Sequence, residues 1–137
     1  MENKPIPVIQ VKGVRKSYGN GAKVCALDDV DLTIGQGERV AIMGQSGSGK
    51  STLLNLICGL DVPTAGKVLF EGRDLAVMSD DDRTRIRRVK MGMIFQTFNL
   101  LPTLTGVENV ALPLRLNGIG LHAATEKALV MIEKVGI

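Results

Sequence analysis

The segment with the clearest chemical meaning is a glycine-rich loop of eight residues, Gly44 to Ser51, with the sequence GQSGSGKS. It fits the pattern G-x-x-x-x-G-K-[ST] without a mismatch. Glycines adopt backbone angles that other residues avoid, so successive N–H groups can point into one concave nest that binds anions. A lysine at this position can reach the β- and γ-phosphates of a nucleotide, and the serine after it can ligate Mg²⁺. The loop therefore predicts a nucleotide site, the alternative being an ordinary glycine-rich turn.

The flanking residues predict how this loop is held. Arg39–Met43 is a short apolar run expected to be a buried strand, and Ser51–Cys58 is expected to be a helix closed by Gly59. The helix would present the positive end of its dipole to the phosphates. The residues predicted to contact them are Gly44, Gln45, Ser46, Gly47, Ser48, Gly49, Lys50, Ser51 and Thr52.

Composition narrows the class of protein. A chain of 137 residues that is 45% hydrophobic can form one domain with a real core. The net charge of +3, the 3% aromatic content and the lack of Trp do not indicate a nucleic-acid binder. No apolar run approaches the roughly 20 residues of a membrane span, and the first seven residues do not resemble a signal peptide. Cys25 and Cys58 are expected to be reduced packing residues of a cytosolic protein.

The rest of the pattern predicts an antiparallel sheet followed by further strands and helices. Strands are expected at 8–18, 24–27, 30–34, 67–70 and 91–95. Helices are expected after the N-caps Ser79 and Thr105, and over Ala123–Val135. Pro113 is expected to bend or end the second helix. The basic run within 83–90 follows three aspartates, which favours a solvated helix polarised along its axis over a phosphate or nucleic-acid patch.

Several motifs in order resemble the nucleotide-binding domain of an ABC transporter. The loop appears as GQSGSGKST, Gly59-Leu60-Asp61 precedes PTAG, and Phe95-Gln96 matches the family's Q-loop. The similarity runs from about Ile9 to Ile137, and residues 87–114 most resemble the macrolide-exporter and lipoprotein-release branch.

The resemblance implies an α/β fold. Its core would be a P-loop NTPase domain, RecA-like with a mostly parallel sheet, over residues 39–96. An N-terminal antiparallel β subdomain would occupy residues 8–38, and the start of a helical subdomain would occupy 97–137.

The resemblance also implies roles for side chains outside the loop. Tyr18 would stack on adenine, with Val24 in the same site, and the alternative is a tyrosine that merely lies at the end of a strand. Gln96 would sense the γ-phosphate and the attacking water, so Lys50 and Gln96 are the expected catalytic residues. Ser51 and Gln96 would be the Mg²⁺ ligands. Without the resemblance, Gln96 is only a polar residue at a strand end.

ATP and Mg²⁺ are the cofactors implied, and the partners are a transmembrane permease and a second ATPase domain arranged head to tail. No nucleic acid is expected as a partner. The location implied is cytoplasmic, peripheral on the membrane through the permease. ABC-type ATPases that act on DNA or ribosomes are an alternative, but they usually carry long insertions after the loop. A small-molecule kinase would lack the context of Tyr18 and Gln96.

Some of the family's motifs do not occur in these residues. There is no Ser-Gly-Gly signature, no apolar run followed by Asp-Glu after Gln96, and no switch histidine. We therefore expect a truncated domain that binds ATP but does not hydrolyse it alone, or a non-catalytic fragment whose role is interaction. We also expect the strands at 39–43 and 91–95 to lack ladder partners.

Overall fold

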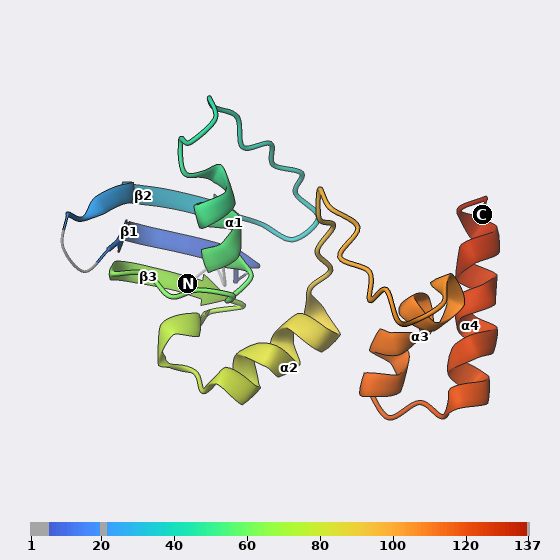
Figure 1. The fold of residues 1–137 in the computed structure, drawn as a ribbon. Helices are drawn as coiled ribbons and strands as arrows, with labels where there is room; N and C mark the ends of the chain where they lie inside the picture. Colours follow the sequence, from blue (N-terminus) through green and yellow to red (C-terminus); the bar gives the residue numbers. More distant parts are fainter. Residues whose placement is uncertain (1–5, 20–21, 137) are drawn as a thin grey trace. The chain divides into compact units, whose positions relative to one another are not determined.

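The computed structural model describes residues 6–19 and 22–136. The chain divides into two compact units, the first ending at Met91 and the second beginning at Gly92. The first unit contains a sheet and the helical segments α1 (Lys50–Ile57), η1 (Leu75–Val77) and α2 (Asp80–Lys90). The second unit contains the helices α3 (Gly106–Leu116) and α4 (Leu121–Lys134) (Figure 1).

The sheet has four strands in the order β2-β1-β3-β4, and every neighbouring pair is antiparallel. Its strands are β1 (Ile9–Tyr18), β2 (Val24–Ile34), β3 (Ala65–Phe70) and β4 (Arg73–Asp74). The two strands expected at 24–27 and 30–34 form the single strand β2. The pairing of β2 with β1 contains a local irregularity but is not interrupted by it. At this point Asp29 adopts a φ of 52°, and the Gly13 amide on β1 donates to Asp31 Oδ1 at 2.9 Å.

The core of the first unit lies between the sheet and α1 (Lys50–Ile57), which covers β1 and β2 in Figure 1. Leu53 and Leu56 are three residues apart and therefore lie on one face of the helix, where both are buried. Val11, Val14 and Val68 are their most deeply buried neighbours in the sheet. This packing sets α1 firmly on the strands, and so fixes where its first residue stands.

The helix α2 (Asp80–Lys90) follows the short 3₁₀ helix η1 (Leu75–Val77). The predicted N-cap is confirmed, since Ser79 Oγ accepts from the Asp82 amide at 3.1 Å. Aspartates fill the first turn and basic residues the last, as expected for a helix polarised along its axis. Arg87 is not simply solvated, because its guanidinium donates to the Gly59 carbonyl at 2.6 Å.

The second unit pairs α3 (Gly106–Leu116) with α4 (Leu121–Lys134). The predicted capping box is confirmed, with Thr105 Oγ1 accepting from the Glu108 amide and Glu108 Oε2 accepting from the Thr105 amide. Ala111, Ala124 and Ala128 are buried at the helix contact. Pro113 was expected to bend or end this helix, and it does not end it, because α3 continues through it to Leu116. The cap and the packing against α4 outweigh the one hydrogen bond that proline removes.

The expected parallel core strands are not formed among the described residues. Segments 39–43 and 91–95 run as irregular chain, and the four strands that do form are antiparallel. Met43 is 90% exposed and Ile94 is 100% exposed. A strand needs a hydrogen-bonded neighbour, and no described segment supplies one to either run. Cys25, expected to be a packing residue, is exposed on β2.

No helix in the described part of the chain has both the length and the apolar character needed to cross a bilayer. The longest, α4, has 14 residues.

Candidate nucleotide-binding site

The glycine-rich loop leads directly into α1, and its glycines adopt the left-handed backbone that the motif requires. Gly47 has a φ of 79° and Gly49 a φ of 90°. Gly49 is also the N-cap of α1, since its carbonyl accepts from the Leu53 amide at 2.8 Å. No side chain of the described chain caps this helix. The first amides of α1 therefore remain available to an anion, with the positive end of the dipole behind them.

Lys50 curls back over the loop that precedes it. Its Nζ donates to the Gly44 carbonyl at 2.8 Å and to the Gln45 carbonyl at 2.6 Å, and lies 3.4 Å from Ser48 Oγ. These contacts hold a positive charge against the loop backbone, where an incoming phosphate would need it. Its partners are backbone carbonyls, and no acidic side chain among the described residues forms an ion pair with it, so its charge stays available to a ligand.

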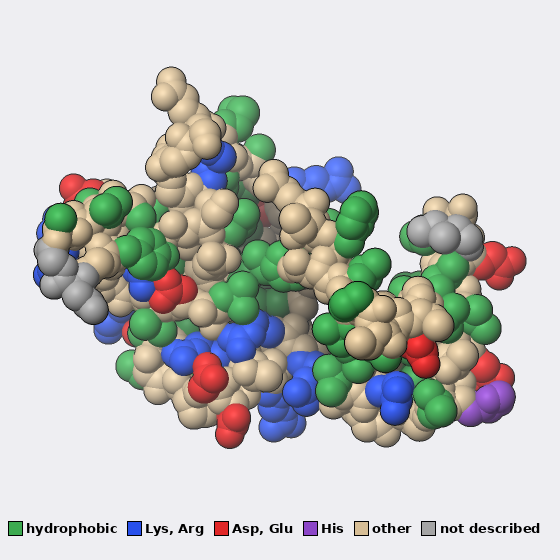
Figure 2. Space-filling model, in the orientation of Figure 1, with side chains coloured by type: hydrophobic (Ala, Val, Ile, Leu, Met, Phe, Trp, Pro, Cys, Tyr) green, Lys and Arg blue, Asp and Glu red, His purple; other side chains and the backbone are tan. Residues whose placement is uncertain are grey.

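The outer surface of the loop is open to solvent. Ser46, Ser48 and Ser51 are exposed, and Thr52 in the first turn of α1 is half-buried. In Figure 2 the loop stands at the top of the view and is mostly backbone and uncharged polar surface. Hydroxyl and amide groups thus dominate the face that a phosphate chain would meet.

The inner side of the loop rests on strand β2. A Cβ placed on Gly49 would overlap the Ala26 carbonyl oxygen and would lie 2.8 Å from Leu27 Cδ2. No side chain larger than hydrogen fits here, so the motif glycine serves packing as well as backbone conformation. This close approach ties the start of α1 to β2, which is an edge strand of the sheet.

Tyr18 and Val24 come together as cross-strand partners at the end of the β1–β2 pair. Tyr18 is 43% exposed and Val24 is 66% exposed, so both offer apolar surface to solvent. Ala26, which touches the loop glycine, is only two residues from Val24 along the same strand. The two residues predicted for adenine therefore lie on the strand pair that supports the phosphate loop.

Two residues that sequence reasoning did not select, Lys16 and Asp61, hold Tyr18 in place. Lys16 Nζ donates to Asp61 Oδ1 at 2.7 Å and lies 4.9 Å from the centroid of the Tyr18 ring. The Tyr18 hydroxyl donates to Asp61 Oδ2 at 3.0 Å. A signal was present in the strand pattern, because Lys16 follows buried Val14 on the same face and a buried ammonium needs an anion.

The pKa of Asp61 reflects this arrangement. Partial burial alone would raise it, since burial disfavours the charged carboxylate. Hydrogen bonds from Lys16, from the Val62 amide and from Tyr18, together with the Lys16 charge, outweigh that effect and hold the pKa of Asp61 below its ordinary value. Asp61 is therefore an anion at neutral pH.

Gln96 lies in the second unit, exposed and in an irregular segment instead of at the end of a strand. The part of the chain that the structure describes contains no cluster of three or more His, Cys, Asp or Glu side chains suited to a metal ion. Ser51 fits a Mg²⁺ ion in its chemistry, because its hydroxyl is exposed in the first turn of α1.

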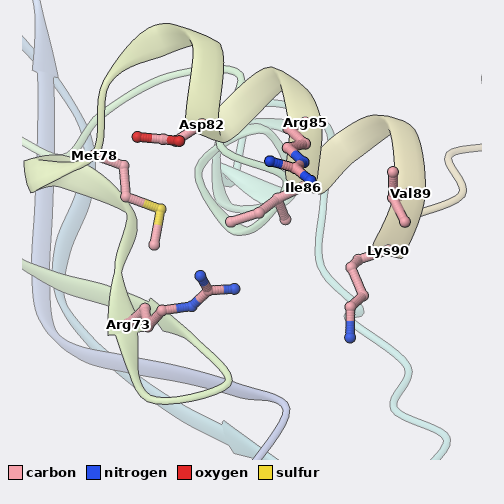
Figure 3. A pocket seen from close by; sticks show the side chains of 7 residues that line it. All are labelled: Arg73, Met78, Asp82, Arg85, Ile86, Val89 and Lys90. Carbon is pink, nitrogen blue, oxygen red and sulfur yellow. The ribbon is translucent and has the colours of Figure 1, made fainter. Parts of the chain in front are cut away.

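A separate cavity of about 460 Å³ lies between β4 and α2. Figure 3 shows the guanidinium groups of Arg73 and Arg85 reaching toward it from opposite sides, with Met78 and Ile86 beside them. None of the residues that line it belongs to the glycine-rich loop or to the Tyr18 contact. The candidate nucleotide site is thus an exposed loop surface, and this cavity is not part of it.

Known proteins resemble this chain over nearly its whole length. Residues 27–137 match the model of the family described as "ABC transporter". The lipoprotein-releasing system ATP-binding protein LolD of Xylella fastidiosa is 44% identical over 130 residues, which cover 94% of this chain and 54% of that protein. The macrolide export ATP-binding/permease protein MacB of Hyphomonas neptunium is 45% identical over 132 residues, 96% of this chain and 20% of that protein. The predicted branch is therefore confirmed.

A solved structure also matches, a dimeric post-hydrolysis state of the ATP-binding cassette MJ0796 bound to ADP and Pi. Its TM-score is 0.85 at 43% identity, covering 91% of this chain and 56% of that one. This match confirms the predicted fold class, an antiparallel β subdomain with helices of an ABC ATPase domain. The chain spans about half the length of LolD and of this structure. The chain belongs to the ABC transporter family, as part of its ATP-binding domain.

Proposed function

We propose that the chain is the ATP-binding part of an ABC transporter ATPase subunit. The phosphate chain of ATP occupies the loop from Gly44 to Thr52, and adenine stacks on Tyr18 beside Val24. One observation carries this proposal, namely that Lys50 Nζ is held on the loop by the Gly44 and Gln45 carbonyls at 2.8 and 2.6 Å. A lysine that has no acidic partner in the described part of the chain, next to uncapped helix amides, is suited to bind an anion.

Mg²⁺ would accompany the nucleotide. Ser51 supplies a hydroxyl ligand from the first turn of α1, and Gln96 supplies an amide oxygen. The metal would neutralise phosphate charge when bound, while Lys50 orients the β- and γ-phosphates. Lys50 and Gln96 are thus the residues proposed to act in catalysis.

These 137 residues are proposed to bind ATP without turning it over. They contain no Asp-Glu pair at the end of an apolar run after Gln96, and no Ser-Gly-Gly signature. No carboxylate is therefore placed to activate water, and no signature loop could face the phosphates of a second domain.

The proposed partners are a transmembrane permease and a second ATPase domain packed head to tail. Two of the relatives support the first, a lipoprotein-releasing system ATP-binding protein and a macrolide export ATP-binding/permease protein. The dimeric ATP-binding cassette supports the second. The site of action is then the cytoplasmic face of a membrane, reached through the permease.

Equilibrium dialysis of Mg²⁺-ATP against the wild type and Lys50→Ala tests the phosphate site. Losing charge-assisted hydrogen bonds, at about 1.5–3 kcal/mol, should weaken binding roughly 10- to 150-fold. Lys12→Ala is the matched control, because Lys12 is an exposed lysine on β1 away from the loop, and should bind as the wild type does. Equal affinity of Lys50→Ala and wild type would overturn the proposal.

A further inference from the structure

We propose that the ion pair between Lys16 and Asp61 is a positioning unit, which fixes the Tyr18 ring in the orientation that receives the adenine base. The inference rests on the proposed function, because it assigns residues to the base end of the same nucleotide site. Neither residue belongs to the glycine-rich loop, and neither is expected to touch the nucleotide.

Both oxygens of Asp61 are engaged. Oδ1 accepts from Lys16 Nζ at 2.7 Å and from the Val62 amide at 2.7 Å, and Oδ2 accepts from the Tyr18 hydroxyl at 3.0 Å. Lys16 Nζ also donates to the Val62 carbonyl at 2.8 Å. Lys16 and the Val62 amide therefore fix the Asp61 carboxylate independently of the tyrosine. Because this acceptor is fixed, it determines the position of the Tyr18 hydroxyl oxygen.

The lysine restrains the same ring from a second direction. Lys16 is only 9% exposed, and its ammonium lies 4.9 Å from the Tyr18 ring centroid, within the range of a cation–π contact. Tyr18 remains 43% exposed. Anchoring the hydroxyl and placing a cation at the ring restricts both side-chain torsions, while the exposed part of the ring stays open to a base.

The ion pair also connects the two ends of α1 to the proposed nucleotide site. Asp61 follows the end of that helix by four residues, and Lys16 stands two residues before Tyr18 on β1. Helix α1 begins at the phosphate loop, and the turn after it holds the side chain proposed for the base. A buried ion pair contributes little net stability, but one that fixes geometry can be retained for specificity.

Binding to a prearranged side chain avoids the cost of ordering it. Loss of that advantage for one aromatic side chain corresponds to roughly a 2- to 12-fold loss of affinity. The loss should apply to ligands that carry a base and be absent for a bare phosphate chain. This difference separates positioning of Tyr18 from a general structural role.

The experiment measures the affinities of the 137-residue chain for Mg²⁺-ATP and for Mg²⁺-tripolyphosphate by equilibrium dialysis. The variants are Asp61→Asn, which removes the charge but keeps the shape, and Tyr18→Phe, which keeps the ring but loses its anchor. Asp28→Asn is the matched control, because Asp28 is an exposed strand aspartate that pairs with Arg15 at 3.1 Å. Melting temperatures verify that each variant is folded.

We expect Asp61→Asn and Tyr18→Phe each to bind ATP 2- to 12-fold more weakly, with tripolyphosphate affinity unchanged. The double variant should be no weaker than the worse single one, since both break the same contact. Tyr18 is the sole Tyr and the chain has no Trp, so intrinsic emission reports this ring alone. ATP should change that emission in the wild type, and Asp61→Asn should need correspondingly more ATP.

Four results would overturn the inference. Unchanged ATP affinity in both variants would show that the anchor does not position the ring. Equal weakening for ATP and tripolyphosphate would show a structural role only. A wild type that binds tripolyphosphate but shows no preference for ATP would remove the base site while leaving the phosphate site of the proposed function intact. Failure to bind either ligand would refute the proposed function and, with it, this inference.

Discussion

Replacing Gly49 by alanine tests whether the phosphate loop is held by close packing on the sheet. The new methyl group would overlap the Ala26 carbonyl oxygen and lie 2.8 Å from Leu27 Cδ2. The backbone at this position has a φ of 90°, which alanine adopts reluctantly. Gly47 is the natural comparison, because its φ is 79° but nothing lies within 4 Å of an added methyl group.

The two substitutions share one cost and differ in another. A non-glycine residue in the left-handed region costs about 1–2 kcal/mol. Alanine also lowers the conformational entropy of the unfolded chain, which stabilises the folded state by about 0.4–1 kcal/mol. Gly47→Ala should therefore lower the free energy of unfolding by up to about 1.5 kcal/mol. Gly49→Ala adds the strain of overpacking, about 1–3 kcal/mol. Its loss should come to roughly 1–5 kcal/mol, always more than that of Gly47→Ala.

Urea unfolding followed by circular dichroism measures the free energy lost in each variant, and thermal unfolding gives the melting temperatures. At about 4–8 °C per kcal/mol for a unit of this size, the two melting temperatures should differ by several degrees or more. If Gly49→Ala proves as stable as Gly47→Ala, the loop does not rest on β2 as described. The contact between Gly49 and β2 would then not set the spacing of the site.

Further predictions concern pH and helix caps. The pKa of Asp61 is lowered in the folded state, so its contribution to stability is complete above its ordinary pKa of about 3.9 and is lost as pH falls through the folded value. The melting temperature should therefore fall as the pH is lowered from 6 to 2. Asp61→Asn should make this fall smaller. Ser79→Ala removes the cap of α2 and should cost about 1 kcal/mol in urea unfolding, whereas Ser79→Asp should keep most of it. Thr105 hydrogen bonds lower the pKa of Glu108, so Thr105→Val should reduce α3 helicity at neutral pH and make the helical signal less sensitive to acid; unchanged helicity would contradict the capping box.

Local signals account for the elements that the sequence predicted correctly. A cap needs only a hydroxyl and an amide three residues away, so Ser79 and the Thr105–Glu108 box could be identified without knowing the fold. The loop motif is also local, because its glycines and Lys50 act within one turn of chain. Pro113 shows the converse, because it does not end α3: packing of α3 on α4 outweighs the local penalty of the proline.

Non-local pairing explains what the sequence could not provide. Segments 39–43 and 91–95 have strand-like composition, but a strand exists only if a neighbour completes its ladder. The contact of Lys16 with Asp61 joins residues 45 apart in sequence, and no period or motif relates them. Knowing that Lys16 is buried indicates that an anion must be near it, but only the structure shows which one.

These long-range contacts give the sheet a role in setting the spacing of the site. Gly49 abuts β2 at Ala26, and Val24 lies two residues away, which is roughly 7 Å along a strand. Tyr18 is paired opposite Val24, and the turn after α1 holds its hydroxyl through Asp61. The proposed phosphate end and the proposed base end of the site are thus joined twice, through β2 and through α1. A change that shifts either connection should alter the match to a whole nucleotide while sparing its separate parts, because each subsite keeps its own local contacts.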